Sequence, residues 1–185
     1  DVTEQKEAEE RQTLLMREID HRAKNALAVA QAVVNLTRAD TIGDYKKAVE
    51  GRIAALARAH SLLAASRWEG ADIRSLVEDE LAAYGDLSDP RFRLDGKPMT
   101  VAANVAQPLA LVLHELATNA AKYGALSNAT GRLDVAWEDR GHKMVLRWAE
   151  NGGPEVAAPE TTGFGSTLLD LLIKELGGAT LDREW

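Results

Sequence analysis

The sequence contains no cysteine, which excludes disulfides, thiolate nucleophiles and thiolate metal ligands together. It also lacks any apolar run approaching the roughly 20 residues needed to cross a bilayer. Basic residues are fewer than acidic ones: the sequence has 22 Lys and Arg and 29 Asp and Glu, which gives a formal net charge of −7. That balance gives no electrostatic footprint for nucleic acid or anionic lipid. We therefore expect a protein of the reducing cytoplasm that binds neither nucleic acid nor membrane.

The composition that is present, 45% hydrophobic and 28% charged over 185 residues, is ordinary for a folded protein. Residues 1–10 are polar and acidic. They are either a solvated helix start or a signalling linker, because they resemble the segment that follows a PAS-type sensor domain. We interpret them as the linker, in which case the chain is a fragment of a longer protein.

Residues 9–39 contain no Pro or Gly and predict a long helix with one apolar face. That face comprises Leu15, Ile19, Ala23, Ala26, Ala30, Val33 and Thr37. A turn at residues 39–44 precedes a second helix, whose apolar stripe comprises Val49, Ile53, Leu56, His60 and Leu63. Two amphipathic helices joined by a short turn predict an antiparallel hairpin over residues 11–68. A second pair of helices completes a four-helix bundle, either by homodimerisation or from within one chain.

The pattern changes after residue 68. Helices are predicted at residues 73–84, 104–123 and 164–176, and strands near residues 92–94, 101, 133–137, 144–148 and from 180. This order predicts an α+β domain over residues 69–185, with helices on one face of a mixed sheet. The strands expected to complete that sheet would follow Trp185.

His21 is the first candidate for chemistry. On a helix it lies roughly 200° from Ile19, so it faces away from the apolar stripe. Lys24 and Asn25 follow within about one turn, so that an imidazole, a cation and an amide share one exposed face. From the helix alone, a plain surface histidine remains the alternative.

A second polar group lies on the predicted helix 104–123. Glu115, Asn119 and Lys122 recur at i, i+4 and i+7 beside an apolar face. An amide oxygen suits Mg²⁺ and a nearby lysine suits the phosphates that Mg²⁺ bridges, whereas a solvated polar face is the alternative. His114 lies roughly 100° from Glu115 and further from Asn119, so we expect a structural role for it.

Two more groups lie in the C-terminal half. Glu150 is in strand phase with Trp148, so we expect it to point inward, where an adenine amino group would be its partner. The alternative is a strand-end acid turned to solvent. Gly152 and Gly153 would let a flat base approach the backbone. The glycine-rich turn at residues 163–165 enters a helix and suits an anion, although it lacks the spacing of a P-loop.

Together these motifs resemble those of the HWE histidine kinases. His21-Arg-Ala-Lys-Asn25 is similar to the phosphoacceptor box, and residues 114–127, HELATNAAKYGALS, are similar to the N box with its histidine. Trp148-Ala-Glu150 matches the Trp-x-Glu of the class name, and Gly163-Phe-Gly165 matches the G box. The four motifs occur in the family's order. The resemblance implies a GHKL-type ATP-binding domain that follows a helical phosphotransfer hairpin.

The resemblance further implies ATP-dependent autophosphorylation of His21, followed by transfer to an aspartate of a response regulator. Asn25 would have an orienting or phosphatase role, and Glu115 would be a further catalytic candidate. Asn119 would hold Mg²⁺. The residues implied at the nucleotide are Asn119, Lys122, Tyr123, Glu150, Gly152, Gly153, Gly163, Phe164, Gly165, Ser166, Thr167 and Leu168.

One position departs from the wider pattern. Orthodox histidine kinases carry an acid directly after the histidine, where this chain has Arg22. Glu18 and Asp20 each lie about 100° from His21 on a straight helix, so the general base stays open.

Two other functional classes compete with an active kinase. One is a degenerate kinase that serves as a regulator-binding scaffold, and the presence of His21, Asn119 and Glu150 argues against it. The other is a GHKL-type ATPase or serine kinase, and a helical hairpin that carries an exposed histidine argues against that.

Overall fold

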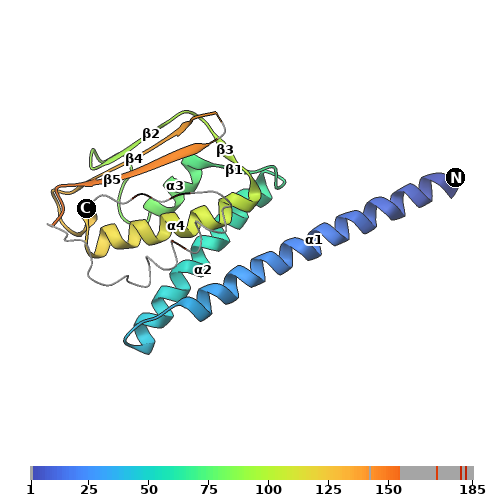
Figure 1. The fold of residues 1–185 in the computed structure, drawn as a ribbon, viewed down its shortest axis with the longest axis horizontal. Helices are drawn as coiled ribbons and strands as arrows, with labels where there is room; N and C mark the ends of the chain where they lie inside the picture. Colours follow the sequence, from blue (N-terminus) through green and yellow to red (C-terminus); the bar gives the residue numbers. More distant parts are fainter. Residues whose placement is uncertain (1, 142, 155–169, 171–179, 181, 183–185) are drawn as a thin grey trace. The chain divides into compact units, whose positions relative to one another are not determined.

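The computed structural model describes residues 2–141, 143–154, 170, 180 and 182. These residues belong to two compact units, residues 1–49 and residues 50–185, and each is considered by itself. The elements follow the order α1, α2, β1, α3, β2, β3, α4, η1, β4 and β5 (Figure 1). No helix in the described part of the chain is long and apolar enough to cross a membrane.

The first unit contains α1, Val2–Leu36, and the start of α2, Ile42–Ala65. The first helix was predicted to start near residue 9, and it starts earlier because the acidic residues before that point are also good helix formers. The turn is shorter than predicted, because Thr41 caps α2: its Oγ1 accepts a hydrogen bond from Asp44 N at 3.1 Å. Tyr45 Oη donates to the carbonyl of Val34 at 2.8 Å, which ties the two helix ends together.

The buried face of α2 differs from the predicted stripe. Its buried residues are Arg52, Ala55, Ala59 and Leu63. Two predicted members are instead exposed, Ile53 by 37% and His60 as well. The alanines allow close helix packing, and Arg52 is buried because Glu115 pairs with it. Hydrophobic periodicity cannot reveal a buried ion pair. The predicted apolar stripe therefore lies about one residue away from the face that is buried.

The second unit turns sharply after α2. Arg67 and Trp68 have positive φ angles of 53° and 66°, and Trp68 N donates to the carbonyl of Leu63 at 2.7 Å. The chain then forms β1, Ala71–Asp72, which pairs antiparallel with β3, Thr100–Val101. The two-residue strand β1 was not predicted, because so short a segment carries no periodicity.

Helix α3, Ile73–Leu81, and helix α4, Ala103–Lys122, lie on one face of a three-stranded sheet (Figure 1). Asp72 caps α3 by accepting from Ser75 N at 2.9 Å. Leu113 and Ala117 of α4 belong to the same apolar core as Leu133 and Val135 of the sheet. The predicted arrangement of helices on one sheet face is confirmed.

The sheet has the order β2-β4-β5. Strand β2, Phe92–Gly96, runs parallel to β4, Arg132–Asp139, because α4 crosses over between them. Strand β5, Met144–Asn151, pairs antiparallel with β4, and the sheet is therefore mixed, as predicted. The predicted helix at residues 164–176 lies outside the described residues except for Asp170. The strand expected from Thr180 lies outside them except for Thr180 and Asp182.

Candidate functional site

His21 lies within α1, and its side chain is outside the part of the structure that is described. Its neighbours are better defined. Lys24 Nζ lies 2.6 Å from Asp20 Oδ2, and both side chains are largely exposed. Asp20 is thus paired along the helix with Lys24, and the general base for His21 stays open. Asn25 is exposed one turn after His21.

The end of α4 carries the residues proposed for metal and phosphate. Asn119, Lys122 and Tyr123 are all exposed, Tyr123 by 66%. The helix stops here because the carbonyl of Asn119 accepts hydrogen bonds from Tyr123 N at 2.8 Å and Gly124 N at 3.1 Å. An amide and an ammonium group are therefore presented to solvent at the last turn of a helix.

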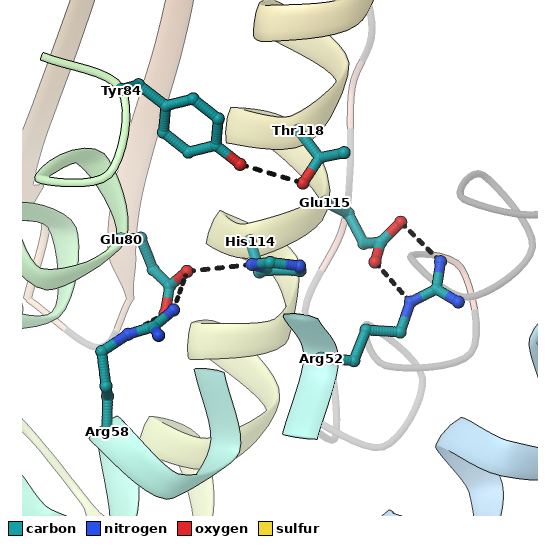
Figure 2. Close-up of polar contacts among 7 residues, drawn as sticks. All are labelled: Arg52, Arg58, Glu80, Tyr84, His114, Glu115 and Thr118. Carbon is teal, nitrogen blue, oxygen red and sulfur yellow. Dashed lines mark hydrogen bonds and ion pairs between the residues drawn. The ribbon is translucent and has the colours of Figure 1, made fainter. Parts of the chain in front are cut away.

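Glu115 does not belong to that exposed group. It is 5% exposed, and both carboxylate oxygens are bound by Arg52 of α2 (Figure 2). Arg52 Nε lies 2.6 Å from Oε1 and Nη2 lies 2.9 Å from Oε2. The predicted stripe of Glu115, Asn119 and Lys122 thus separates into one buried ion pair and two exposed residues. A buried carboxylate held on both oxygens is a structural partner, and the geometry gives no support to a catalytic role.

His114, the neighbour of Glu115, meets a different acid. Its Nδ1 lies 3.1 Å from Oε2 of Glu80, which is 3% exposed (Figure 2). Arg58 of α2 binds both oxygens of the same carboxylate, with two contacts of 2.7 Å. His114 therefore lies in a network of buried polar groups, which agrees with the structural role expected for it.

Glu150, near the end of β5, is bonded to the backbone that follows the end of α4. The residue is exposed near the end of strand β5, which corrects the expectation that it points inward. Oε2 accepts from Ala125 N at 2.8 Å, and Oε1 accepts from the indole Nε1 of Trp148 at 3.0 Å. Strand alternation cannot detect such contacts, because they depend on a loop distant in sequence.

Trp148 entered the sequence analysis only as part of the Trp-x-Glu motif, without a role of its own. The Trp-x-Glu spacing was a usable signal, since residues i and i+2 share one face of a strand and can pair. The described geometry shows the pairing directly, as a hydrogen bond between the two side chains. Trp148 therefore orients the Glu150 carboxylate from its own strand.

The backbone after α4 and the backbone after β5 lie in close contact. A Cβ added at Gly153 would lie 2.9 Å from Ala125 N, so only glycine fits there without displacement. Asn128 Nδ2 donates to the carbonyl of Gly152 at 3.2 Å and adds a second link. Asn119, Lys122 and Tyr123 are thus brought to the same corner as Glu150, Gly152 and Gly153.

The corner has donors that fit an adenine nucleotide with Mg²⁺. Among the described residues no group of three or more His, Asp or Glu is placed to hold a metal ion. Mg²⁺ at Asn119 would therefore take phosphate oxygens and water as its other ligands, which is its usual arrangement at nucleotides. The G-box residues Gly163, Phe164, Gly165, Ser166, Thr167 and Leu168 lie outside the described residues.

A family model of the HWE histidine kinases matches residues 18–98. A blue-light-activated histidine kinase of Brucella ovis is 39% identical over 191 residues, covering 100% of this chain and 39% of the relative. One from Rhizobium johnstonii is 38% identical over 173 residues, covering 92% of this chain and 49% of the relative. The chain thus spans less than half the length of these curated relatives.

Among solved structures, the blue-light-activated histidine kinase of Erythrobacter litoralis gives a TM-score of 0.62 at 19% identity, covering 88% of this chain and 52% of that one. The histidine kinase domain of that protein gives 0.54 at 14% identity, covering 85% of both chains. These two likenesses show a shared fold. The family is shown instead by the match over residues 18–98 and by the curated relatives, one of which is 39% identical across 100% of this chain: the chain belongs to the HWE histidine kinases.

Proposed function

We propose that the chain is the kinase core of a sensor histidine kinase. It uses ATP and Mg²⁺ to phosphorylate its own His21 and passes the phosphoryl group to an aspartate of a response regulator. The observation that carries this proposal is the hydrogen bond from Ala125 N to Glu150, which joins the end of α4 to the end of β5. That bond gathers residues suited to base and phosphate into one corner.

Near the adenine base of ATP, Glu150 is held by Trp148 and Ala125 but can accept further hydrogen bonds. A carboxylate offers about four lone-pair sites, and the two contacts described occupy one on each oxygen. The remaining sites accept a hydrogen bond from the adenine amino group. Gly152 and Gly153 leave room beside the backbone for a planar base.

At the phosphates, Asn119 offers an amide oxygen to the metal and Lys122 offers a cation. Asn119 would hold the Mg²⁺, which would supply positive charge to offset that of the phosphates. Lys122 is exposed, so its ammonium group can turn toward the phosphates without breaking a described ion pair.

Phosphoryl transfer requires neutral His21, because an imidazolium has no lone pair for attack. The imidazole nitrogen forms a bond to the γ-phosphorus while the bond from that phosphorus to the bridging oxygen breaks, and ADP leaves with the electron pair. The imidazole ring then loses its remaining proton to solvent or to a base. Asn25, which is exposed one turn later, would orient the histidine or a hydrolytic water.

The partners follow from this role. A receiver domain supplies the accepting aspartate, a PAS-like sensor domain precedes residues 1–10, and the hairpin forms a homodimer in the cytoplasm. The regulator's aspartate takes the phosphoryl group from phosphohistidine and leaves neutral His21 ready for another cycle.

The test is labelling with ATP that carries a radioactive γ-phosphate. We expect label that survives base and is lost in acid, and His21→Ala should abolish it while Mg-ATP affinity, measured by calorimetry, stays close to wild type. His60→Ala is the matched control, because His60 is an exposed histidine whose described contact is the Trp68 ring at 4.8 Å. Acid-labile label that persists in His21→Ala would reject His21, and Mg-ATP binding without any label would favour the scaffold alternative.

A further inference from the structure

Five side chains in the second unit link α2 to the helices behind the candidate site. We call them the α2 clamp: Arg52 and Arg58 of α2, Glu80 of α3, and His114 and Glu115 of α4 (Figure 2). The side chains of Glu80 and Glu115 are 2% and 6% exposed, and that of Arg52 is 7% exposed. Each buried acid has a cationic partner that reaches it from the same helix, α2.

Arg52 and Glu115 form a two-pronged contact, Nε to Oε1 at 2.6 Å and Nη2 to Oε2 at 2.9 Å. A planar guanidinium that binds both oxygens fixes the direction of the carboxylate as well as its distance. This contact therefore constrains how α4 is rotated about its own axis at Glu115.

Glu80 is shared between Arg58 and His114. Because a carboxylate only accepts hydrogen bonds, the contact from His114 at 3.1 Å requires a hydrogen on Nδ1. The opposite edge of the ring faces α2: a Cβ added at Gly51 would lie 2.9 Å from His114 Nε2. His114 thus fills the space between the two helices at a point where only glycine leaves room for it.

Buried ion pairs are weak stabilisers, since apolar residues of similar volume often hold a core equally well. What they add is directional contact at defined positions. His114 and Glu115 are adjacent and lie about 100° apart on α4, so the clamp holds that helix from two sides. Asn119 follows Glu115 by one turn, and Lys122 follows within two.

We propose that the α2 clamp positions α4 for phosphoryl transfer, an inference that rests on the proposed function. The clamp sets the orientation of Asn119 and Lys122 relative to α2. That helix is continuous from residue 42, in the unit that carries His21, to residue 65. Arg52, Arg58 and His114 are then positioning residues, which act on the nucleotide through α4.

The test is the double variant Arg52→Met with Glu115→Met, which removes both charges and fills the same space. Arg74→Met with Glu78→Met is the matched control, because that pair has the same residue types, lies 3.5 Å apart on α3 and is exposed. Urea unfolding, Mg-ATP affinity and the initial rate of His21 labelling at saturating ATP are measured for each full chain.

We expect the clamp variant to keep its fold and to bind Mg-ATP within about twofold of wild type. Its labelling rate at saturating ATP should fall at least about tenfold, because a small misplacement of reacting groups costs more in rate than in binding. The control pair should keep all three properties. A clamp variant that is stable and labels at the wild-type rate would overturn the inference.

A second comparison covers the case in which the double variant fails to fold. His114→Gln keeps a donor that can reach Glu80, whereas His114→Leu removes it. We expect His114→Gln to retain most of the labelling rate and His114→Leu to lose most of it at saturating ATP. Equal rates in both variants and in the wild type would reject the positioning role. Absence of label in the wild type itself would reject the proposed function instead.

Discussion

The polar residues in the C-terminal half of α4 fall into two groups with opposite surroundings. Around His114 and Glu115 the polar side chains are enclosed and paired with residues of other helices. One turn later, Asn119 and Lys122 are open to solvent. The comparison shows that a run of polar residues on one helix can divide into a part that fixes the helix and a part left available for a ligand.

The cause of the difference is the reach of α2. Arg52 pairs with Glu115 of α4, and Arg58 pairs with Glu80 of α3, which in turn contacts His114. In the described part of the chain no side chain of this kind is bonded to Asn119 or Lys122. Burial of an acid without a cation is costly, so the position of the arginines decides which acids of the sequence enter the interior.

The largest effect on stability is expected from Arg52→Ala, which disrupts the enclosed part of this polar run. Removing the guanidinium leaves Glu115 buried without a partner, and loss of one member of a buried pair costs about 3–5 kcal/mol of folding free energy. Urea unfolding followed by circular dichroism measures the change. A loss below about 1 kcal/mol, the range of an exposed pair, would show that Glu115 finds water or another donor.

A smaller effect is expected from Trp148→Phe, which keeps the ring and removes the indole N–H. The hydrogen bond to Glu150 is lost, at a cost of about 1 kcal/mol in stability. Because Glu150 loses one of its two supports, Mg-ATP affinity should also fall, and calorimetry measures this. Unchanged affinity would show that the bond from Ala125 is sufficient to orient the carboxylate.

The smallest effect on stability is expected from Asn119→Ala. The residue is exposed and alanine is a good helix former, so the free energy of unfolding should change by less than about 0.5 kcal/mol. Mg²⁺-dependent ATP affinity should nevertheless drop markedly. Full Mg-ATP affinity in this variant would remove Asn119 from the metal site and would show that exposure at the end of α4 serves another purpose.

The sequence was sufficient for most elements of the fold. Apolar periodicity located α3 and α4 closely and α1 with a start that was too late, and strand alternation located β4 and β5. It misplaced the buried face of α2, because Arg52 is interior only by virtue of Glu115, more than 60 residues away. The hairpin boundary at residue 68 stays a prediction, whereas the compact units divide within α2, between Val49 and Glu50.

The roles of the candidate site residues stay predictions, and their geometry was predicted only in part. Spacing proposed Asn119, Lys122 and Glu150, and the structure brings the end of α4 and the end of β5 together. Spacing did not predict that Glu115 is buried or that Glu150 is exposed. Both depend on partners distant in sequence, Arg52 for Glu115 and Ala125 for Glu150. The role of His21 stays a prediction, because its side chain is outside the described part of the structure.

The α2 clamp also bears on how this core can be recombined with other proteins. A chimera that attached a foreign helical hairpin after residue 65 would discard Arg52 and Arg58 and leave Glu80 and Glu115 without cations. A junction placed before Gly51, at a matching point in the helical repeat, would retain all the partners. The natural module for transplantation therefore carries the second half of α2 with it, so that a foreign hairpin should be joined within this helix rather than at the loop that follows it.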